Sequence, residues 1–270
     1  MRRMRTALTI AGSDSGGGAG IQADLKTFTA FKVFGLSAVT GLTAQNTQGV
    51  QGVELPTTDF IAAQLRSVLE DIGADAAKTG MLATGGIIRA VAAAVREFGV
   101  RNLVVDPVMI AASGDALMQH EAAPVMRDHL FPLATVVTPN LDEATFLCER
   151  KIRTEDGMRE AARAIAAMGP KYVLIKGGHI PGERVIDLLY DGREFIRREC
   201  ARVPGEFHGT GCTLSSAIAA GLAKGLPVPE AVATAQEYVA LALRSAPEVG
   251  RGRRPLNHFP EGFVPPQERR

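Results

Sequence analysis

The chain lacks the residues that build disulfide-rich, zinc-binding or membrane-spanning proteins. Its 270 residues include three cysteines, no tryptophan and 5% aromatic side chains. Cys148, Cys200 and Cys212 are too few for a disulfide scaffold, and no Cys/His spacing indicates a zinc site. No apolar run approaches the roughly 20 residues of a membrane span, and residues 6–10 are too short for a signal-peptide core. We therefore expect a cytoplasmic protein without a membrane partner.

Two glycine motifs that bind nucleotides are also missing. There is no GxxxxGK(S/T) sequence, which argues against a P-loop enzyme. Residues 16–20 read Gly-Gly-Gly-Ala-Gly, but they lack the GxGxxG spacing and the acidic strand end that follows it about 20 residues later. A Rossmann oxidoreductase is therefore disfavoured. We interpret this loop as a place where the backbone approaches a small substrate closely.

The charges of the chain nearly balance, with 30 Lys and Arg residues against 29 Asp and Glu residues. No basic face indicates a nucleic-acid partner. The arginines that cluster near both ends are expected in solvated tails. With 46% hydrophobic residues over this length, the chain can bury a sizeable core in one large domain.

Apolar, β-rich runs alternate with helical patterns along the chain. We expect strands at residues 7–12, 36–43, 76–79, 103–105, 135–138 and 172–175. Helices are expected over residues 21–28, after Thr57 or Thr58, and at 87–98, 141–150, 155–168 and 229–245. An Asp-Gly turn predicts a hairpin over 185–198, and the Pro-rich tail from about 251 is expected to be irregular. This alternation predicts one α/β domain, residues 1–270, whose parallel sheet is covered on both faces.

Polar and sulfur-containing side chains stand where the predicted strands end. They are Asp14, Gln45, Met81, Asp106, Asn140 and Lys176. Ligands of open parallel sheets bind outside the carboxyl ends of the strands. The sequence therefore predicts a single active site at this edge of the sheet.

The sequence His-Gly-Thr-Gly-Cys at residues 208–212 opens a helix rich in Ala and Ser. The unpaired N–H groups of a helix N-terminus attract phosphate, so Gly209, Thr210 and Gly211 are candidates for an anion site. Cys212 stands where a helix N-terminus favours a thiolate, and a base or a nucleophile is one interpretation. A glycine-rich turn with a small buried cysteine is the other, and the two stand about even.

Each remaining candidate also has two interpretations. Asp106 suits Mg²⁺ beside a polyphosphate or a plain turn, and Lys176 suits a phosphate or the surface. Asn140 and Glu143 fit a capping box, while Glu143 also suits a metal site. Gln45 suits an aminopyrimidine edge or an ordinary polar loop.

The order of these motifs resembles one known family. Residues 11–24 (AGSDSGGGAGIQAD) and 208–213 (HGTGCT) are the specific parts. Residues 43–47, 78–82, 106–109, 113–114, 138–144 and 176–179 are similar to the family pattern as well, so the match extends from about residue 6 to about 260. The chain resembles the hydroxymethylpyrimidine/phosphomethylpyrimidine kinases of thiamin biosynthesis, which belong to the ribokinase-like superfamily.

The resemblance implies a three-layer α/β/α sandwich with a central, mostly parallel sheet, and a kinase that uses ATP and Mg²⁺. It implies that 4-amino-5-hydroxymethyl-2-methylpyrimidine is phosphorylated first and its monophosphate second. Cys212 would be the base, with Gly209, Thr210 and Gly211 completing the anion hole. The other implied roles are pyrimidine binding by Gln45, Gly12, Asp24, Met81 and Val108, ATP binding by Lys176 and Asn140, and Mg²⁺ binding by Asp106 and Glu143. A homodimer is also implied.

Two segments depart from the family pattern, residues 204–207 (PGEF) and residues 252–258 (GRRPLNH). The first departure puts local ATP contacts in question, and the second has no mechanistic interpretation from the sequence. Two alternatives stay open beside the pyrimidine kinase. One is a pyridoxal or pyridoxine kinase of the same fold. The other is a non-catalytic module that binds the pyrimidine.

Overall fold

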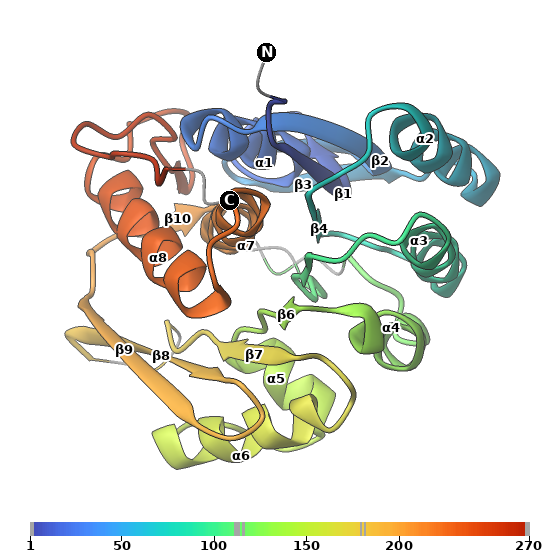
Figure 1. Ribbon diagram of the computed structural model, residues 1–270. Helices are drawn as coiled ribbons and strands as arrows, with labels where there is room; N and C mark the ends of the chain where they lie inside the picture. Colours follow the sequence, from blue (N-terminus) through green and yellow to red (C-terminus); the bar gives the residue numbers. More distant parts are fainter. Residues whose placement is uncertain (1–2, 111–113, 115–116, 179, 181, 268–270) are drawn as a thin grey trace.

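A nine-stranded sheet forms the middle layer of the molecule, with the strand order β3-β2-β1-β4-β5-β6-β7-β8-β9 (Figure 1). The computed structural model describes residues 3–110, 114, 117–178, 180 and 182–267. The strands are β1 Thr6–Asp14, β2 Phe34–Asn46, β3 Gly49–Glu54, β4 Ala76–Thr79, β5 Leu103–Val105, β6 Val136–Val137, β7 Tyr172–Ile175, β8 Arg184–Tyr190 and β9 Phe195–Ala201. Six neighbouring strands pair in parallel, in the order β2, β1, β4, β5, β6 and β7. At the edges of the sheet, β3, β8 and β9 pair antiparallel. The predicted mostly parallel sheet is therefore confirmed.

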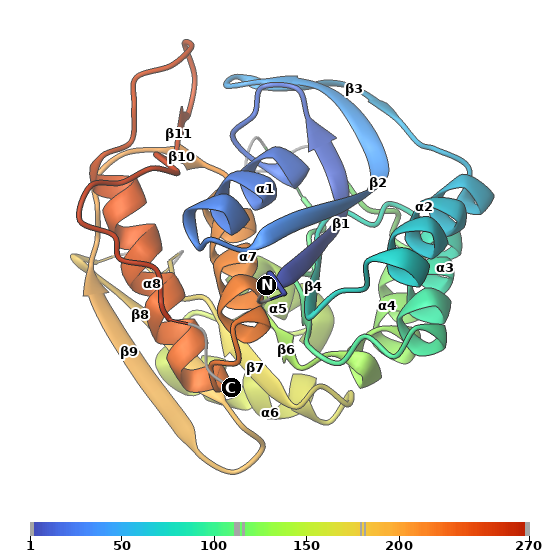
Figure 2. The same cartoon turned by 45° about the horizontal axis from the view of Figure 1, so that its top comes forward.

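Helices cover both faces of this sheet (Figure 2). They are α1 Gly20–Ala30, α2 Thr58–Asp71, α3 Gly85–Glu97, α4 Ala122–His129, α5 Leu141–Cys148, α6 Glu155–Ala166, α7 Thr210–Ala223 and α8 Val228–Arg244. Helices α2 to α6 share one apolar core with one face, and α1, α7 and α8 share a second core with the other. Burying apolar surface on both sides of the sheet gives the expected three-layer sandwich.

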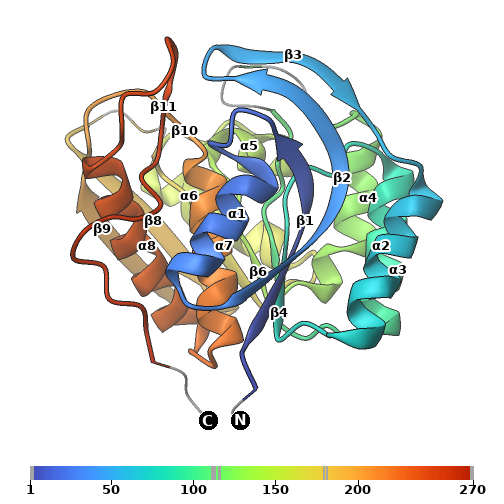
Figure 3. The ribbon, with the colours of Figure 1, turned by 90° about the horizontal axis from the view of Figure 1, so that it is seen from above.

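Helix α7 is the most enclosed of these helices, as every residue from Thr213 to Ala223 is buried. It packs between α1 and α8 and lies against β1, β4 and β5 (Figure 3). A Cβ on Gly221 would lie 3.0 Å from the Cβ of Ala231 in α8, so the two helices approach closely. The small side chains of α7 therefore allow α1 and α8 to pack closely against it, and the N-terminus of α7 remains accessible to a ligand.

The predicted helix starts are confirmed where a side chain caps the first turn. Thr57 Oγ1 accepts a hydrogen bond from the Phe60 amide at 3.3 Å. Asn140 and Glu143 form the predicted capping box at the start of α5, because Asn140 Oδ1 accepts from the Glu143 amide and Glu143 accepts from the Asn140 amide. These contacts satisfy N–H groups that have no partner within the helix.

The structure differs from the sequence-based expectation at β2 and β3, at α4 and in the tail. Strand β2 continues through residues 44–46, which were expected to lie in a loop, and it turns back as β3. Helix α4 was not predicted. The tail is not wholly irregular, because Arg254–Pro255 forms a strand, β11, that pairs in parallel with β10, Phe207–His208. Within the described residues, no helix is long and apolar enough to cross a membrane.

Candidate active site

A cavity of 1220 Å³ opens at the carboxyl ends of the parallel strands. Strands β1, β4, β5 and β7 all end at its wall, as does the loop that leads into α5. The predicted site residues that line it are Gly12, Gln45, Met81, Asp106, Val108, Asn140, Glu143, Lys176, Gly209, Thr210, Gly211 and Cys212. The sheet thus brings together residues that lie up to 200 positions apart in the sequence. Two further residues of the family motifs, Ser113 and His179, lie outside the described part of the chain.

The N-termini of two helices, α1 and α7, meet at this cavity. Both are entered through a glycine with positive φ, which is 56° at Gly20 and 87° at Gly209. A Cβ on Gly209 would overlap the carbonyl oxygen of Gly18, and a Cβ on Gly20 would overlap that of Gly12. Only glycine fits this close approach of two turns. The two partial positive charges of the helix ends face the same space, which suits a phosphate.

Cys212 lies on the first turn of α7 and contributes to the cavity wall. We expected the helix N-terminus to favour its thiolate, and this expectation is wrong for the free protein. Burial raises the pKa of the Cys212 thiol to about 11, although the Lys78 ammonium and the Gly20 N–H act in the opposite direction. Asp24 and Asp106 add to the increase by repulsion. Cys212 is therefore a neutral thiol at neutral pH that can take part in proton transfer only as a reaction proceeds.

Asp24 is the one predicted substrate contact that does not line the cavity. It is fully buried and forms an ion pair with Lys78, which is also fully buried, at 2.9 Å. Thr9 Oγ1 and Ser216 Oγ donate further hydrogen bonds to its carboxylate. Every carboxylate oxygen is thus used inside the protein. Ser216 follows Cys212 by one helical turn, so its hydrogen bond connects Asp24 to the start of α7. Asp24 also pairs with Lys78, whose charge lowers the pKa of the Cys212 thiol.

Asp106, Lys176 and Glu143 form a charged group on the cavity wall. Lys176 Nζ lies 3.0 Å from Asp106 Oδ1 and 3.9 Å from Glu143 Oε2. Burial lowers the pKa of the Lys176 ammonium, but attraction by the two carboxylates outweighs it and raises the pKa above its usual value. Burial and the neighbouring Asp106 raise the pKa of Glu143 to about 7, against the attraction of Lys176. Lys176 is therefore a permanent cation, while Glu143 can gain or lose a proton near neutral pH.

This group fits a magnesium ion that is shared with a phosphate ligand. Mg²⁺ in nucleotide enzymes takes one or two carboxylates and completes its shell with phosphate oxygens and water. Asp106 and Glu143 offer two carboxylates on the wall beside Lys176. Among the described residues, no cluster of three or more His, Cys, Asp or Glu side chains forms a metal site built from protein alone.

His208 connects Asp14 to Gln45 on the cavity wall. Asp14 accepts hydrogen bonds from the amides of Gly16, Gly18 and Ala19, and His208 Nε2 lies 2.9 Å from Asp14 Oδ2. The side chain of Gln45 lies 3.1 Å from the same His208 nitrogen. Sequence reasoning treated His208 only as part of the glycine turn.

A further part of the wall was not predicted. It comes from β8, β9, the loop after β9, and α8, and includes Asp187, Cys200, Val203, Gln236, Val239 and Leu243. Asp187 accepts hydrogen bonds from the Gly177 amide and from Gln236 Nε2. Burial raises the pKa of Asp187 despite these contacts. No motif in the sequence marked these residues, because they are mostly apolar and come from separate elements.

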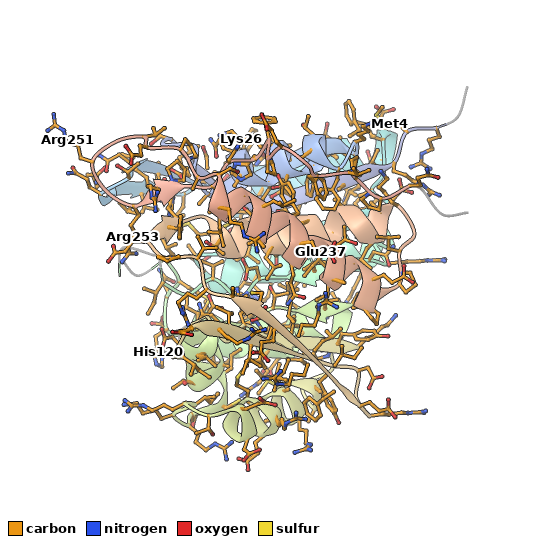
Figure 4. All side chains as sticks on the ribbon, turned by 90° about the vertical axis from the view of Figure 1, so that its left-hand side faces the viewer. Met4, Lys26, His120, Glu237, Arg251 and Arg253 are labelled. Carbon is orange, nitrogen blue, oxygen red and sulfur yellow. The ribbon has the colours of Figure 1, made fainter. Side chains whose placement is uncertain are left out.

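The two segments that depart from the family pattern meet at the rim of the cavity. Arg253 Nε lies 3.3 Å from Glu206 Oε2, and the Arg254 guanidinium lies 5.1 Å from the centre of the Phe207 ring. Arg251 and Arg253 are seen at the same edge of the molecule (Figure 4). The two departures thus form one local unit, the β10–β11 pair, and each supplies the other's partner.

Comparison with known proteins agrees with this arrangement. The family model described as phosphomethylpyrimidine kinase matches residues 14–257. A hydroxymethylpyrimidine/phosphomethylpyrimidine kinase of Rhizobium meliloti is 49% identical over 94% of this chain and 96% of that protein. The enzyme of the same name from Bacillus subtilis is 44% identical over 94% of both.

Solved structures show the same fold. The chain superimposes on an ADP complex of Bacillus subtilis pyridoxal kinase with a TM-score of 0.89 and 43% identity, covering 95% of this chain and 98% of that one. It superimposes on phosphomethylpyrimidine kinase from Clostridium difficile with a TM-score of 0.78 and 43% identity, covering 87% and 98%. Because the family model matches nearly the whole chain and these relatives are 44–49% identical over most of their length, this chain is a kinase that belongs to the phosphomethylpyrimidine kinase family.

Proposed function

We propose that this kinase transfers phosphate from ATP to 4-amino-5-hydroxymethyl-2-methylpyrimidine and then to the resulting monophosphate, as the names of its relatives suggest. The observation that carries the proposal is one cavity that joins three groups. These are the amide side chain of Gln45, the turn of residues 209–211 (the anion turn) with Cys212, and the charged pair Asp106 and Lys176. A non-catalytic module is disfavoured because the chain belongs to a kinase family and its cavity brings these three groups together.

The pyrimidine is proposed to lie against Gly12, Met81 and Val108, with Gln45 at its polar edge. Gly12 and Met81 are in contact already, since a Cβ on Gly12 would lie 3.0 Å from Met81 Sδ. A flat ring can lie on this apolar surface because Gly12 has no side chain to cover it. The Gln45 carboxamide has an acceptor and a donor side by side, and this matches the ring nitrogen and the amino group of the substrate.

Phosphoryl transfer through a loose transition state depends on position and charge more than on a strong base. The amides of Gly209, Thr210, Gly211 and Cys212 are proposed to hold the equatorial oxygens of the phosphate that is transferred. The proton of the substrate hydroxyl passes to Cys212 Sγ late in the reaction. Because the thiol is neutral in the free protein, Cys212 first releases its own proton to solvent. Attraction by the Lys78 ammonium stabilises the thiolate, which then accepts the proton of the substrate hydroxyl.

Lys176 is proposed to neutralise the phosphates of the nucleotide, and Asp106 with Glu143 to hold Mg²⁺. When bound, the metal would neutralise part of the negative charge of the phosphates. Asp106 also keeps Lys176 in place, with Thr138 Oγ1 donating to the same carboxylate oxygen at 3.1 Å. Asn140 caps α5 on the same wall and is proposed to lie beside the nucleotide phosphates.

The nucleoside of ATP is proposed to occupy the wall formed by β8, β9 and α8. Val203, Val239 and Leu243 give this part an apolar lining, as a purine ring requires. The wall begins beside Lys176, because Gly177 is hydrogen-bonded to Asp187 of β8. A nucleotide that extends from this wall therefore reaches the anion turn with its terminal phosphate.

The proposal is tested by ADP release with Mg·ATP and the pyrimidine alcohol, followed by mass analysis of the products. A parallel reaction contains pyridoxal, because pyridoxal kinases share this fold. Mono- and diphosphate from the pyrimidine are expected. Phosphate on pyridoxal alone would overturn the substrate assignment, and no ADP with either alcohol would overturn the activity.

The resemblance to the family also leads us to propose a homodimer. All the site residues discussed above come from one chain, so the proposed chemistry does not depend on the assembly. Sedimentation equilibrium at micromolar concentration distinguishes a dimer from a monomer of 28.6 kDa.

A further inference from the structure

We propose that His208 is a specificity-determining residue, because with Asp14 and Thr43 it locks the Gln45 carboxamide in the one orientation that accepts an aminopyrimidine and rejects an oxopyrimidine. The inference rests on the proposed function for the identity of the ligand. It is based on the hydrogen-bond donors and acceptors that surround the Gln45 carboxamide.

The contact with Asp14 decides whether His208 Nε2 carries a proton. Asp14 is almost fully buried and accepts three backbone N–H groups, which fits an ionised carboxylate. Burial raises the pKa of Asp14, but the hydrogen bonds from His208 and Ala19 outweigh it, so the pKa is lowered below its usual value. A carboxylate oxygen 2.9 Å from His208 Nε2 requires that this nitrogen carries a proton. His208 is therefore a donor at Nε2.

The structure places Gln45 Nε2, not Oε1, 3.1 Å from His208 Nε2. An amide N–H placed there would point at another N–H. With the amide oxygen there instead, Gln45 shares the single Nε2–H of His208 with Asp14, as the second acceptor of a bifurcated hydrogen bond. A half turn of the carboxamide exchanges the two atoms without moving anything else.

The contacts of Thr43 independently favour the same orientation of the Gln45 carboxamide. Thr43 Oγ1 lies 2.9 Å from the carbonyl oxygen of Ser13 and 3.0 Å from the position that the structure gives to Gln45 Oε1. A hydroxyl has one proton, and the Ser13 carbonyl can only accept it. The Gln45 atom beside Thr43 must then be the amide nitrogen, which donates to the hydroxyl oxygen. Both neighbours thus place the oxygen of Gln45 toward His208 and its nitrogen toward Thr43.

This orientation decides what the cavity recognises. After these two contacts, the amide keeps one acceptor position on oxygen and one N–H on nitrogen. A 4-aminopyrimidine offers the complementary pair, an amino donor and a ring-nitrogen acceptor. A 4-oxopyrimidine offers a carbonyl acceptor and a ring N–H, in the reverse order. To bind it, Gln45 would have to turn its N–H toward the N–H of His208, and the site would lose both anchoring hydrogen bonds.

His208 is held firmly enough to impose this choice. Its side chain is 13% exposed. It lies in β10, in register with Pro255 of β11. A Cβ on Gly18 would lie 2.7 Å from His208 Cδ2 and 3.3 Å from the Cβ of Pro255, so the ring fits between the glycine loop and the tail. The β10–β11 pair thus fixes the ring that orients Gln45.

The test compares 4-amino-5-hydroxymethyl-2-methylpyrimidine with its 4-oxo counterpart in the full chain. Both Kd values are measured by calorimetry, and kcat/KM by ADP release. We expect the wild-type protein to favour the amino compound by roughly 10²-fold or more. His208→Phe keeps the ring but loses the N–H, and is expected to reduce this ratio at least tenfold. A residue with only a structural role would weaken both ligands equally and leave the ratio unchanged.

Matched variants keep the result interpretable. His120→Phe replaces another histidine of the cavity wall that does not contact Gln45, and its ratio should equal that of the wild type. Thr43→Val removes the second anchor and should reduce the ratio, whereas Thr43→Ser should preserve it, so the inference can be tested even if the His208 variant does not fold. An unchanged ratio in folded His208→Phe and Thr43→Val, or no preference in the wild type, overturns the inference. Selective binding without ADP release would support the inference and overturn the proposed function.

Discussion

The Asp24 carboxylate and the Lys78 ammonium form an ion pair 2.9 Å apart, with both side chains completely buried. The pair connects α1 to β4, and Ser216 Oγ of α7 donates to the same carboxylate. Burial lowers the pKa of Lys78, but attraction by Asp24 outweighs it, so the pKa is raised and the lysine stays charged. Each charge in this pair is tolerated inside the protein only because of the other.

Neutralising one member of this pair is therefore expected to cost more than neutralising both. Asp24→Asn or Lys78→Met alone should lower the free energy of unfolding by about 3–5 kcal/mol, since each leaves an unpaired buried charge. The double variant should lose less than the sum of the two. Urea denaturation of the four proteins completes the cycle. Strictly additive losses would show that the two charges do not depend on each other.

The fold could be predicted from the sequence because its strands carry their signal locally. Residues 76–79, 103–105 and 172–175 were predicted with the bounds that the structure has. The β10–β11 pair was not, since a two-residue strand has no periodicity, and its partner lies more than 40 residues away. Strand β3 was missed because its residues are largely exposed, with no alternation of buried and exposed positions.

The candidate site was predicted to the extent that polar residues mark strand ends. Gln45, Asp106, Asn140 and Lys176 reach the cavity for that reason. The position of Asp24 could not be predicted in this way, because its role depends on what packs against the buried side of α1. A signal for it did exist, since a lysine inside the short apolar strand of residues 76–79 requires a buried partner. The pKa of Cys212 depends on its burial by the whole fold, and no local sequence pattern indicates how deeply a side chain is buried in the folded protein.

Gly209→Ala is expected to abolish the anion turn. The residue has φ 87°, and a Cβ would overlap the Gly18 carbonyl oxygen. The turn must shift, so kcat/KM should fall by roughly 10²-fold or more, as it does when oxyanion donors are lost. Gly192→Ala is the matched control, because Gly192 has φ 93° but nothing lies within 4 Å of its Cβ position. Equal activity of the two variants would remove Gly209 from the anion site.

Cys212→Ala should lower the kcat/KM of the first phosphorylation by roughly 10²-fold or more while the Kd of the pyrimidine changes little. Because the pKa of this thiol is raised to about 11, the thiolate fraction grows as pH rises from neutral toward 11. The wild-type rate should rise over that range, and the rate of the variant should not. Cys148→Ala, outside the cavity, serves as the control. Turnover of Cys212→Ala at the wild-type rate would contradict the role of a base.

Asp106→Asn keeps the shape of the side chain and removes its charge. If Asp106 holds the metal, the Mg²⁺ concentration that gives half the maximal rate should rise roughly tenfold or more, since a neutral amide is a weak ligand for Mg²⁺. The rate is measured across a magnesium titration at saturating ATP. Asp128→Asn on the surface of α4 is the control, as Asp128 pairs only with the neighbouring Arg127 in the described contacts. An unchanged magnesium requirement would exclude the assignment.

His258 makes folding sensitive to acid. Its side chain is 3% exposed and Nε2 lies 3.1 Å from Thr213 Oγ1 of α7. Burial and repulsion by Lys26 lower the pKa of His258 to about 4, whereas an unfolded histidine has a pKa of about 6.5. Between these two values the unfolded chain binds a proton that the folded chain does not, so stability must rise with pH across this window.

The expected loss between pH 6.5 and pH 4 is about 3 kcal/mol, because one pKa unit corresponds to about 1.4 kcal/mol. The His258→Gln variant cannot gain this proton and should lose less stability over the same range of pH. Urea denaturation at half-unit steps of pH measures both slopes. Parallel curves for the two proteins would show that His258 is not the group responsible. Because the hydroxyl partner of His258 follows Cys212 directly in the sequence, acid unfolding from this position should begin at the first turn of α7 and remove activity before the rest of the fold is lost.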